Sequence, residues 1–487
     1  MDLKNKSLFK QKCFINGRWV DSSSGETLDV NNPASLEIIG NVPKCSVSET
    51  KKVIDDANTA FQTWKETTAK ERSVILKKWG ELITENADDL AKIMTIEQGK
   101  PLAEAKGEIL MGASYIEFYA EEAKRVYGDI VPDPRPGKRI VIIKQPVGVV
   151  GAITPWNFPN SMITRKCAAA LAVGCTTVVK PASQTPYSAL AVAVLAKEAG
   201  FPDGVFNVIT GSASEIGKEL TSNPIVRKIS FTGSTSVGKK LISKCATTVK
   251  KVSMELGGHA PFIVFQDAHI EEAVKGAMAN KYRNSGQVCV SANRIYVHED
   301  IYDEFANKFA EKSSILKVAD GKEEGAQIGP LITEDAYKKV ESHVADAVSK
   351  GAKVLTGGKS DSAGKQFYKP TVLTNINNKM KLYYEETFGP VAPLIKFSSE
   401  EEVIEMANDT KYGLAGYFYS RDIGRIWRVA EALEYGMVGI NAGVISTEVA
   451  PFGGIKESGI GREGAAEGID EYLELKYLCL DGINKNN

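Results

Sequence analysis

The feature that most constrains the fold is an alternation between short apolar runs and helical segments through the middle of the chain. The runs are rich in β-branched residues: VGVVGAIT (147–154), TTVVK (176–180), VFNVIT (205–210) and RKISFTG (227–233). Helical segments such as SALAVAVLAKEAG and SEIGKELTSNP separate these runs. Strands that alternate with helices in this way predict a doubly wound parallel sheet in an α/β domain.

The rest of the chain predicts a second domain and an extended arm. A further series of apolar runs and helices begins near VSMELGGHAPFIVF and continues to about residue 455, and a chain of 487 residues is too long for one core. Residues from about 50 to 125 have helical periodicity, and the prolines of GDIVPDPRPGKRIVIIKQP then break any helix. The tail DEYLELKYLCLDGI alternates apolar and polar residues, which predicts a strand whose partner edge lies inside the chain or on another subunit.

Charge and cysteine content favour small-molecule chemistry in a reducing compartment. The 60 Lys and Arg residues nearly balance 61 Asp and Glu, so the chain as a whole attracts neither nucleic acid nor an anionic membrane. The seven cysteines are scattered and form no C-x-x-C pair, and four histidines leave little material for a metal site. The charged N-terminus has no apolar core, and no stretch approaches 18 apolar residues. We expect a cytoplasmic protein without a resident metal.

Two glycine motifs are candidate phosphate sites, and they differ in context. GIGREG (459–464) is the only G-x-G-x-x-G, but it follows no apolar strand and opens no helix, so we expect it not to bind phosphate. GSTSVGKK (233–240) follows an apolar run and leads into a helix, where free N–H groups can face an anion. Lys240 stands where a nucleotide triphosphatase needs Ser or Thr. The motif could bind a dinucleotide pyrophosphate, or it could be a tight turn without a ligand.

Six short stretches carry a resemblance to a known family. In order they are TPWNFPNSMITRK (154–166), VVKPASQTP (178–186), FTGST (231–235), MELGGHAPF (254–262), GQVC (286–289) and EETFGP (385–390). Together they resemble the aldehyde dehydrogenase superfamily over nearly the whole chain, and SMITRK, RNSGQVC and GIDEYLELKY resemble succinate-semialdehyde dehydrogenases in particular.

The resemblance implies an α/β fold of the aldehyde dehydrogenase type with three parts. A Rossmann-type dinucleotide-binding domain would take residues 1–121 and 144–253, and a second α/β domain, the catalytic one, residues 254–457. A small β oligomerisation arm would take residues 122–143 and 458–487, joining subunits into a homodimer or homotetramer.

Three residues are expected to carry the chemistry. Cys289 fits the nucleophile, because a thiolate adds readily to a carbonyl and leaves an electrophilic thioester; we expect a polar or electropositive site that raises its thiolate fraction, helped by Arg283. The resemblance implies that Asn157 stabilises the oxyanion and that Glu255 activates the hydrolytic water. Glu255 lies among apolar residues and glycines, which predicts a raised pKa. Relatives that pass the acyl group to coenzyme A lack this glutamate, so the resemblance implies hydrolysis to the free acid.

The resemblance also implies the residues that bind cofactor and substrate. The cofactor residues are Trp156, Lys180, Ser183, Gly233, Ser234, Leu256, Glu386 and Phe388. Position 183 is often glutamate in relatives that prefer NAD; the uncharged Ser183 beside Lys180 favours NADP, with NAD possible. Arg165, Arg283 and Ser446 correspond to residues that hold the distal carboxylate of the substrate. Ser291 replaces the second cysteine with which some relatives form a regulatory disulfide.

The sequence therefore predicts NAD(P)-dependent oxidation of succinate semialdehyde to succinate through a cysteine thiohemiacetal and a thioester, a reaction that belongs to GABA degradation. One alternative keeps the enzyme class and changes the substrate to glutarate semialdehyde or a less charged aldehyde. A second is a binding or structural protein without turnover, which would not need Cys289, Glu255, Asn157 and Lys180 together. A third, a cysteine hydrolase, would need a histidine partner for Cys289, and the sequence indicates none.

Overall fold

The parallel strands predicted in the middle of the chain form the centre of an eight-stranded sheet. The computed structural model describes residues 2–482, and the strand order of this sheet is β19-β11-β10-β7-β8-β9-β1-β2. The strands are β1 (Cys13–Ile15), β2 (Arg18–Val20), β7 (Val149–Ile153), β8 (Thr176–Lys180), β9 (Phe206–Val208), β10 (Val226–Thr232), β11 (Lys251–Glu255) and β19 (Gly459–Ile460). The five central strands, β7 to β11, are parallel, and β1 and β19 join antiparallel at either side of them.

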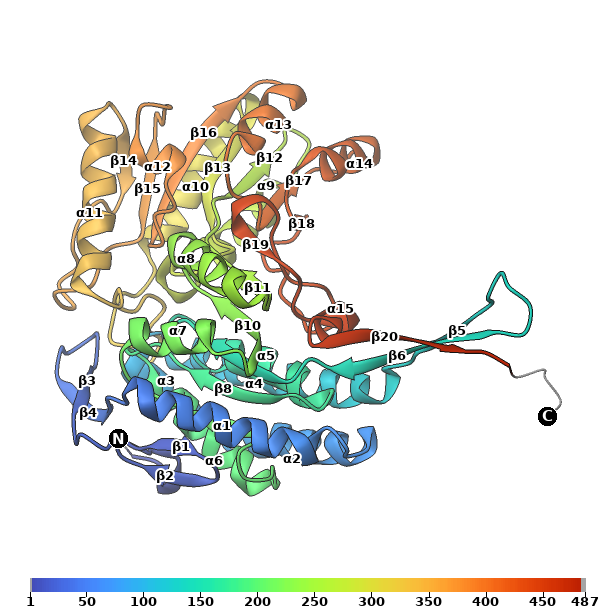
Figure 1. The fold of residues 1–487 in the computed structure, drawn as a ribbon. Helices are drawn as coiled ribbons and strands as arrows, with labels where there is room; N and C mark the ends of the chain where they lie inside the picture. Colours follow the sequence, from blue (N-terminus) through green and yellow to red (C-terminus); the bar gives the residue numbers. More distant parts are fainter. Residues whose placement is uncertain (1, 483–487) are drawn as a thin grey trace.

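Helices cover both faces of this sheet, which confirms the doubly wound architecture (Figure 1). The helices are α1 (Val47–Trp64), α2 (Ala69–Glu85), α3 (Ala87–Gln98), α4 (Leu102–Glu122), α5 (Ser161–Ala172), α6 (Pro186–Ala199), α7 (Ala213–Ser222) and α8 (Thr235–Cys245). Helices α1, α7 and α8 pack on the side of Val149 and Val178, and α2 to α6 on the side of Val150 and Val179. Successive strand residues face opposite sides, so an uninterrupted apolar run is buried on both.

The second series of runs forms a seven-stranded sheet in the order β14-β15-β16-β13-β12-β17-β18. Its strands are β12 (Ala260–Val264), β13 (Ala292–His298), β14 (Lys353–Thr356), β15 (Thr371–Thr374), β16 (Val391–Phe397), β17 (Ala415–Tyr419) and β18 (Met437–Ile440). Its helices are α9 (Ile270–Tyr282), α10 (Tyr302–Ser314), α11 (Glu334–Ser349), α12 (Lys381–Tyr384), α13 (Glu400–Asn408) and α14 (Ile423–Ala432). In Figure 1 this domain lies above the first, with α8, β10 and β11 next to it.

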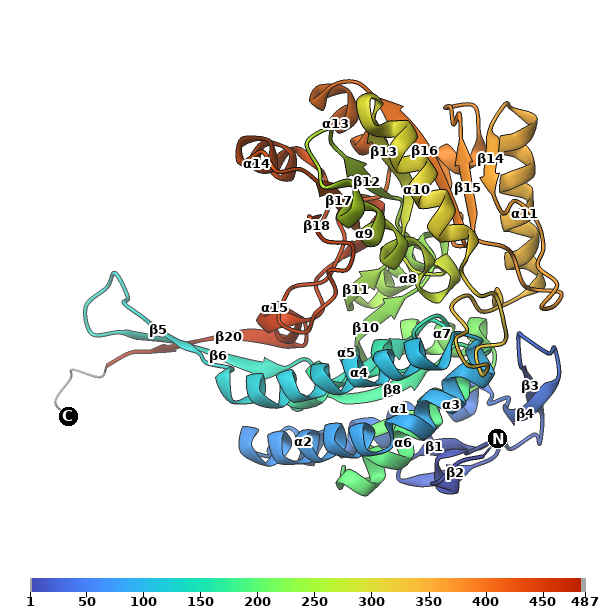
Figure 2. The same ribbon diagram turned by 180° about the vertical axis from the view of Figure 1, so that it is seen from behind.

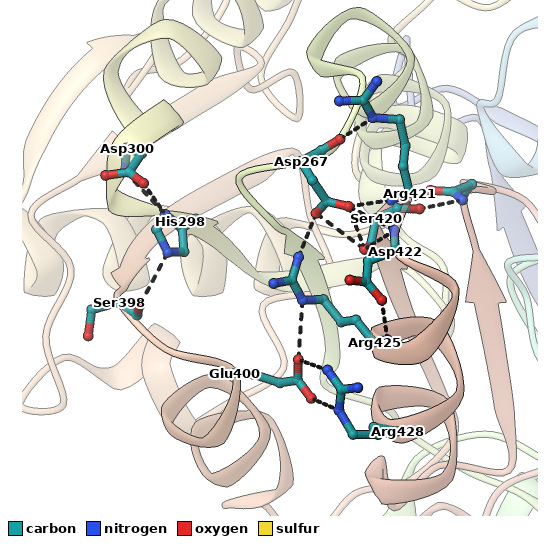
Figure 3. Close-up of polar contacts among 11 residues, drawn as sticks. Asp267, His298, Asp300, Ser398, Glu400, Ser420, Arg421, Asp422, Arg425 and Arg428 are labelled. Atoms are coloured by element: carbon teal, nitrogen blue, oxygen red, sulfur yellow. Dashed lines mark hydrogen bonds and ion pairs between the residues drawn. The ribbon is translucent and has the colours of Figure 1, made fainter.

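A polar network ties together the segments at one end of the second sheet (Figure 3). The Asp267 carboxylate accepts the backbone N–H groups of Arg421 (2.6 Å) and Asp422 (2.9 Å) and pairs with the Arg425 guanidinium (2.7 Å). Glu400 on α13 pairs with Arg425 and with a second arginine of α14, Arg428. The start of α14 is thereby held to the turn that follows β12 and to α13.

The arm is a three-stranded sheet that projects away from the two domains (Figure 2). Its order is β20-β6-β5, with β5 (Asp129–Val131), β6 (Arg139–Pro146) and β20 (Leu473–Leu480). The terminal strand β20 therefore finds its partner edge inside the chain, on β6. The remaining elements are a hairpin of β3 (Thr27–Asn31) and β4 (Ile38–Pro43), the helix α15 (Ala465–Asp470) and the 3-10 turns η1 (Lys6–Leu8), η2 (Ala123–Arg125), η3 (Ala246–Thr248), η4 (Arg283–Gly286), η5 (Glu299–Ile301) and η6 (Lys456–Ser458).

The segment expected to form the C-terminal part of the arm is divided between two parts of the fold. β19 pairs with β11 of the first sheet, and α15 packs on α4 and α5, so only β20 joins the arm. Residues 483–487 of that segment lie outside the described residues. Within residues 2–482, no helix combines the length and apolar character that crossing a membrane requires.

Candidate active site

A cavity of about 320 Å³ between the two domains collects nearly all of the predicted site residues. Those that line it are Trp156, Asn157, Arg165, Gly233, Ser234, Glu255, Leu256, Arg283, Cys289, Glu386, Phe388 and Ser446. Lys180 and Ser183 do not line it. They lie at and just after the end of β8, beside the strand that leads to Trp156. Residues far apart in sequence meet here because the carboxyl ends of parallel strands lie at one edge of a sheet.

Cys289 follows a tight turn with unusual backbone geometry. Asn284, Ser285 and Gly286 all have positive φ (48°, 57° and 76°). A Cβ on Gly286 would lie 2.1 Å from the carbonyl oxygen of Gly389, so this position requires glycine. The sequence carried no signal for the left-handed conformation of Asn284 and Ser285, since asparagine only moderately favours it and serine does not.

The pKa of the Cys289 thiol is raised to about 12, chiefly by burial and then by the nearby Glu386 carboxylate. Arg165 and Arg283 act in the opposite direction, as expected of arginines, but they do not outweigh burial. The expectation of a raised thiolate fraction is therefore wrong for the resting site. Attack by this sulfur near neutral pH has to be accompanied by loss of its proton.

Asn157 is buried and its amide is oriented by the turn that carries Cys289. Its Nδ2 donates one hydrogen bond to the carbonyl of Gln287 (3.0 Å), which leaves its second N–H free to serve another acceptor. The backbone carbonyl of Asn157 accepts hydrogen bonds from Lys100 Nζ (2.7 Å) and Asn284 Nδ2 (3.1 Å).

Glu255 ends β11 as a buried carboxylate without a hydrogen-bond donor among the described residues. Burial raises its pKa well above the ordinary value, and the neighbouring Glu463 carboxylate raises it further. The two glycines that follow permit a close approach: a Cβ on Gly258 would lie 2.3 Å from the carbonyl oxygen of Cys289. The predicted rise in pKa is confirmed, and burial is its main cause.

The two predicted substrate arginines are in different electrostatic states. Arg165 donates from Nε to Glu463 Oε2 (2.6 Å) and shares that carboxylate with Lys166, so its guanidinium already has an anionic partner. Arg283 has no carboxylate within ion-pair distance in the described part of the chain, and its guanidinium lies 5.3 Å from the centre of the Phe158 ring. Of the two arginines that line the cavity, Arg283 is therefore the one without a carboxylate partner among the described residues.

Glu463 belongs to the motif GIGREG, whose glycines have a structural role in the fold. Gly459 and the residue after it form β19, and a Cβ on Gly459 would lie 2.2 Å from the Met254 carbonyl oxygen. The glycines thus let the segment approach β11 closely. Sequence analysis missed Glu463, although a lone acid within a glycine-rich stretch was the available signal.

The other end of the cavity has the features of a site for an anionic dinucleotide. Gly233 joins β10 to α8, and a Cβ there would lie 2.4 Å from the Phe231 ring. Ser234 precedes the first turn of α8 without a side-chain cap, so the first N–H groups of that turn have no side-chain acceptor. Lys180 is buried with no carboxylate partner among the described residues, and burial lowers its pKa to about 8. A buried cation and open N–H groups fit phosphate or ribose oxygens.

Aromatic and acidic side chains complete this end. Trp156 and Phe388 meet edge to face, with ring centres 5.7 Å apart. Glu386 accepts the backbone N–H of Gly258 (3.1 Å), and burial raises its pKa to about 7. The cavity is thus lined by flat apolar rings and a carboxylate as well as by the turn at Gly233 and the thiol.

Comparison with known proteins gives one consistent result. The model of the aldehyde dehydrogenase family matches residues 19–478. The chain is 59% identical over 483 residues to glutarate-semialdehyde dehydrogenase from Pseudomonas aeruginosa (99% of this chain, 100% of the relative) and 58% identical over 480 residues to NADP(+) succinate-semialdehyde dehydrogenase from Escherichia coli (99% and 100%). A crystal structure described as an E. coli NADP-dependent enzyme superposes with a TM-score of 0.98 at 58% identity, covering 99% of this chain and 100% of the other. The chain belongs to the aldehyde dehydrogenase family.

Proposed function

We propose that this protein oxidises succinate semialdehyde to succinate with NADP as the preferred hydride acceptor. The observation that carries the proposal is that Arg283, a guanidinium without a carboxylate partner among the described residues, lines the same cavity as Cys289. A short semialdehyde has an aldehyde at one end and a carboxylate at the other, and this pair of residues suits both ends. The name of the E. coli relative supports the same substrate and cofactor.

The residues of the cavity supply the steps of the reaction. Cys289 Sγ forms a bond to the aldehyde carbon while the carbonyl double bond opens and its electron pair moves to the oxygen. The thiol proton passes to water, and the Asn157 amide donates to the negatively charged oxygen of the resulting thiohemiacetal. The bound nicotinamide would supply the acceptor for the hydride that leaves this carbon. Glu255 then takes a proton from water as the water attacks the thioester, and the carbon–sulfur bond breaks to give the acid and Cys289.

The residues proposed to hold the cofactor are those of the Gly233 end of the cavity together with Lys180 and Ser183. Lys180 Nζ lies 3.5 Å from Ser183 Oγ, so a cation and a hydroxyl are adjacent, and among the described residues no carboxylate pairs with this lysine. This supports a preference for NADP, with NAD also accepted.

Glutarate semialdehyde is the second candidate substrate, and the name of the P. aeruginosa relative favours it. It differs by one methylene, and a difference of that size changes selectivity by only about 10- to 200-fold in an apolar pocket. The distal carboxylate, not the chain length, is thus the stronger basis for the assignment.

The test is initial-rate kinetics with succinate semialdehyde, glutarate semialdehyde and butanal, each with NADP and with NAD. We expect kcat/KM for succinate semialdehyde to exceed that for butanal by at least ~10²-fold, and Arg283→Met to remove most of this difference while leaving butanal oxidation nearly unchanged. Cys289→Ser should abolish oxidation of all three aldehydes. Equal efficiency on butanal and the semialdehydes would contradict the substrate assignment, and full activity of Cys289→Ser would contradict the mechanism.

We further propose that the enzyme acts in the cytoplasm as a homodimer or homotetramer, in GABA degradation. Exposed apolar residues on the arm support assembly between subunits. We propose the same three-part domain division as in the sequence analysis, with one change: β19 and α15 belong to the dinucleotide-binding domain.

A further inference from the structure

A buried network behind the cavity joins the two loops that carry Asn157 and Cys289. It starts between α3 and α4, where Lys100 is fully buried and pairs with Glu108 of α4 at 2.5 Å. Lys100 Nζ also donates to the Asn157 carbonyl (2.7 Å), and Glu108 Oε1 accepts the backbone N–H groups of Asn160 (3.0 Å) and Ser161 (3.1 Å). The ion pair thus holds both ends of the segment from Asn157 to Ser161.

The same network reaches the Cys289 turn through Asn284. Asn284 Nδ2 donates to the carbonyls of Asn157 (3.1 Å) and Gln287 (3.3 Å), and its Oδ1 accepts from Gln98 Nε2 (3.0 Å). Gln98 Oε1 in turn accepts the backbone N–H of Lys100 (2.9 Å). Gln287 is two residues before Cys289 and is also the acceptor for the Asn157 amide.

We propose that Lys100, held by Glu108, is a positioning residue that fixes the Asn157 amide relative to the Cys289 turn. This inference rests on the proposed function, because it assigns Asn157 the oxyanion. Neither Lys100 nor Glu108 lines the cavity. A buried ion pair is weak support for stability, since desolvation offsets the attraction, so its geometry is the better reason for its presence. An oxyanion donor acts only if it is preorganised, and an error of about 1 Å can cost ~10²-fold in rate.

The experiment compares Lys100→Met/Glu108→Gln, which removes the contact without leaving a buried unpaired charge, with Asn157→Ala and with all three substitutions combined. We expect the first variant to lower kcat by about 10²-fold, with KM and the Kd for NADP changed by less than about threefold. Asn157→Ala should lower kcat by about 10²- to 10³-fold. The combined variant should be no more than about threefold slower than Asn157→Ala, because Lys100 acts through that amide.

A second variant and a matched control keep the test decisive if the first variant does not fold. Asn284→Gly removes the other donor to the Asn157 carbonyl and keeps the left-handed backbone, and we expect the same dependence on Asn157. Lys228→Met removes another buried lysine, which bonds Ser253 and Glu471 away from the cavity, and should keep kcat within about threefold.

Two results would overturn this inference and leave the proposed function intact. One is an unchanged kcat in both Lys100→Met/Glu108→Gln and Asn284→Gly. The other is a combined variant whose loss of kcat equals the product of the separate losses. A wild-type enzyme that oxidises no aldehyde would overturn the proposed function, and the inference with it.

Discussion

At the scale of single residues, the raised pKa of Glu255 determines how activity depends on pH. A free glutamate has a pKa of about 4.3, and burial together with Glu463 places the Glu255 pKa well above that value. Only the deprotonated carboxylate takes a proton from water, so kcat should rise with pH through the raised pKa and fall as the medium becomes more acidic. Glu255→Gln should remove this limb and lower kcat by about 10²- to 10⁴-fold, as measured by steady-state rates across pH.

The same variant separates the two halves of the reaction. Glu255→Gln should still give a burst of NADPH of about one per site, because Cys289 and Asn157 are intact. Glu97 offers a matched control: it is another buried glutamate, whose pKa burial raises to about 8, but it binds the backbone N–H groups that open α6. Glu97→Gln should leave the pH limb in place. Loss of the burst in Glu255→Gln would place that residue in the first half of the reaction and contradict its assignment.

At the scale of elements, the Asp267 network of Figure 3 determines how firmly α14 is held. Burial alone would raise the pKa of Asp267, but hydrogen bonds from Arg421, Ser420 and Asp422 and the charge of Arg425 lower it on balance. A lowered pKa in the folded state means that the stabilisation is complete above the unfolded value near 3.9 and is lost as pH falls through the folded value.

Asp267→Ala should therefore lower the free energy of unfolding by about 2 kcal/mol at pH 7, and by less near pH 3. Calorimetric unfolding at the two pH values measures the difference. Asp300→Ala is the control, since Asp300 is largely exposed and lies 3.5 Å from the His298 ring; it should change stability by less than about 0.5 kcal/mol. Equal effects of the two substitutions would show that the network does not hold α14.

At the scale of the whole molecule, the arm exposes apolar side chains that the rest of the chain does not cover. Leu475 is 70% exposed and Tyr477 57% exposed on one face of β20, while Leu478 and Leu480 are exposed on the other. Apolar side chains on both faces of a projecting sheet are the observation that supports the proposed contact with another subunit. Leu475→Glu/Tyr477→Glu should reduce the mass of the particle in light scattering, from tetramer or dimer towards monomer. An unchanged mass would show that this face of the arm does not join subunits.

The sequence by itself determined the buried strands, the glycine turn and the main site residues, because local patterns encode these features. The β-branched runs near Val149 and Val178 required strands buried on both faces, and the strand–glycine–helix order at Gly233 required an open helix N-terminus. The motif residues Cys289, Asn157 and Glu255 indicated a shared site, and the cavity brings them together.

Only the tertiary structure decided the electrostatics of that site, because they depend on contacts between distant segments. Arg165 and Arg283 looked alike in the sequence, but of the two only Arg165 pairs with Glu463, almost 300 positions further along. Burial outweighed the effect of the arginines on the Cys289 pKa, and no sequence motif indicated the Lys100–Glu108 pair behind Asn157. Residue type and spacing determine which groups can meet, whereas burial and the partners that the fold supplies determine their charge and orientation.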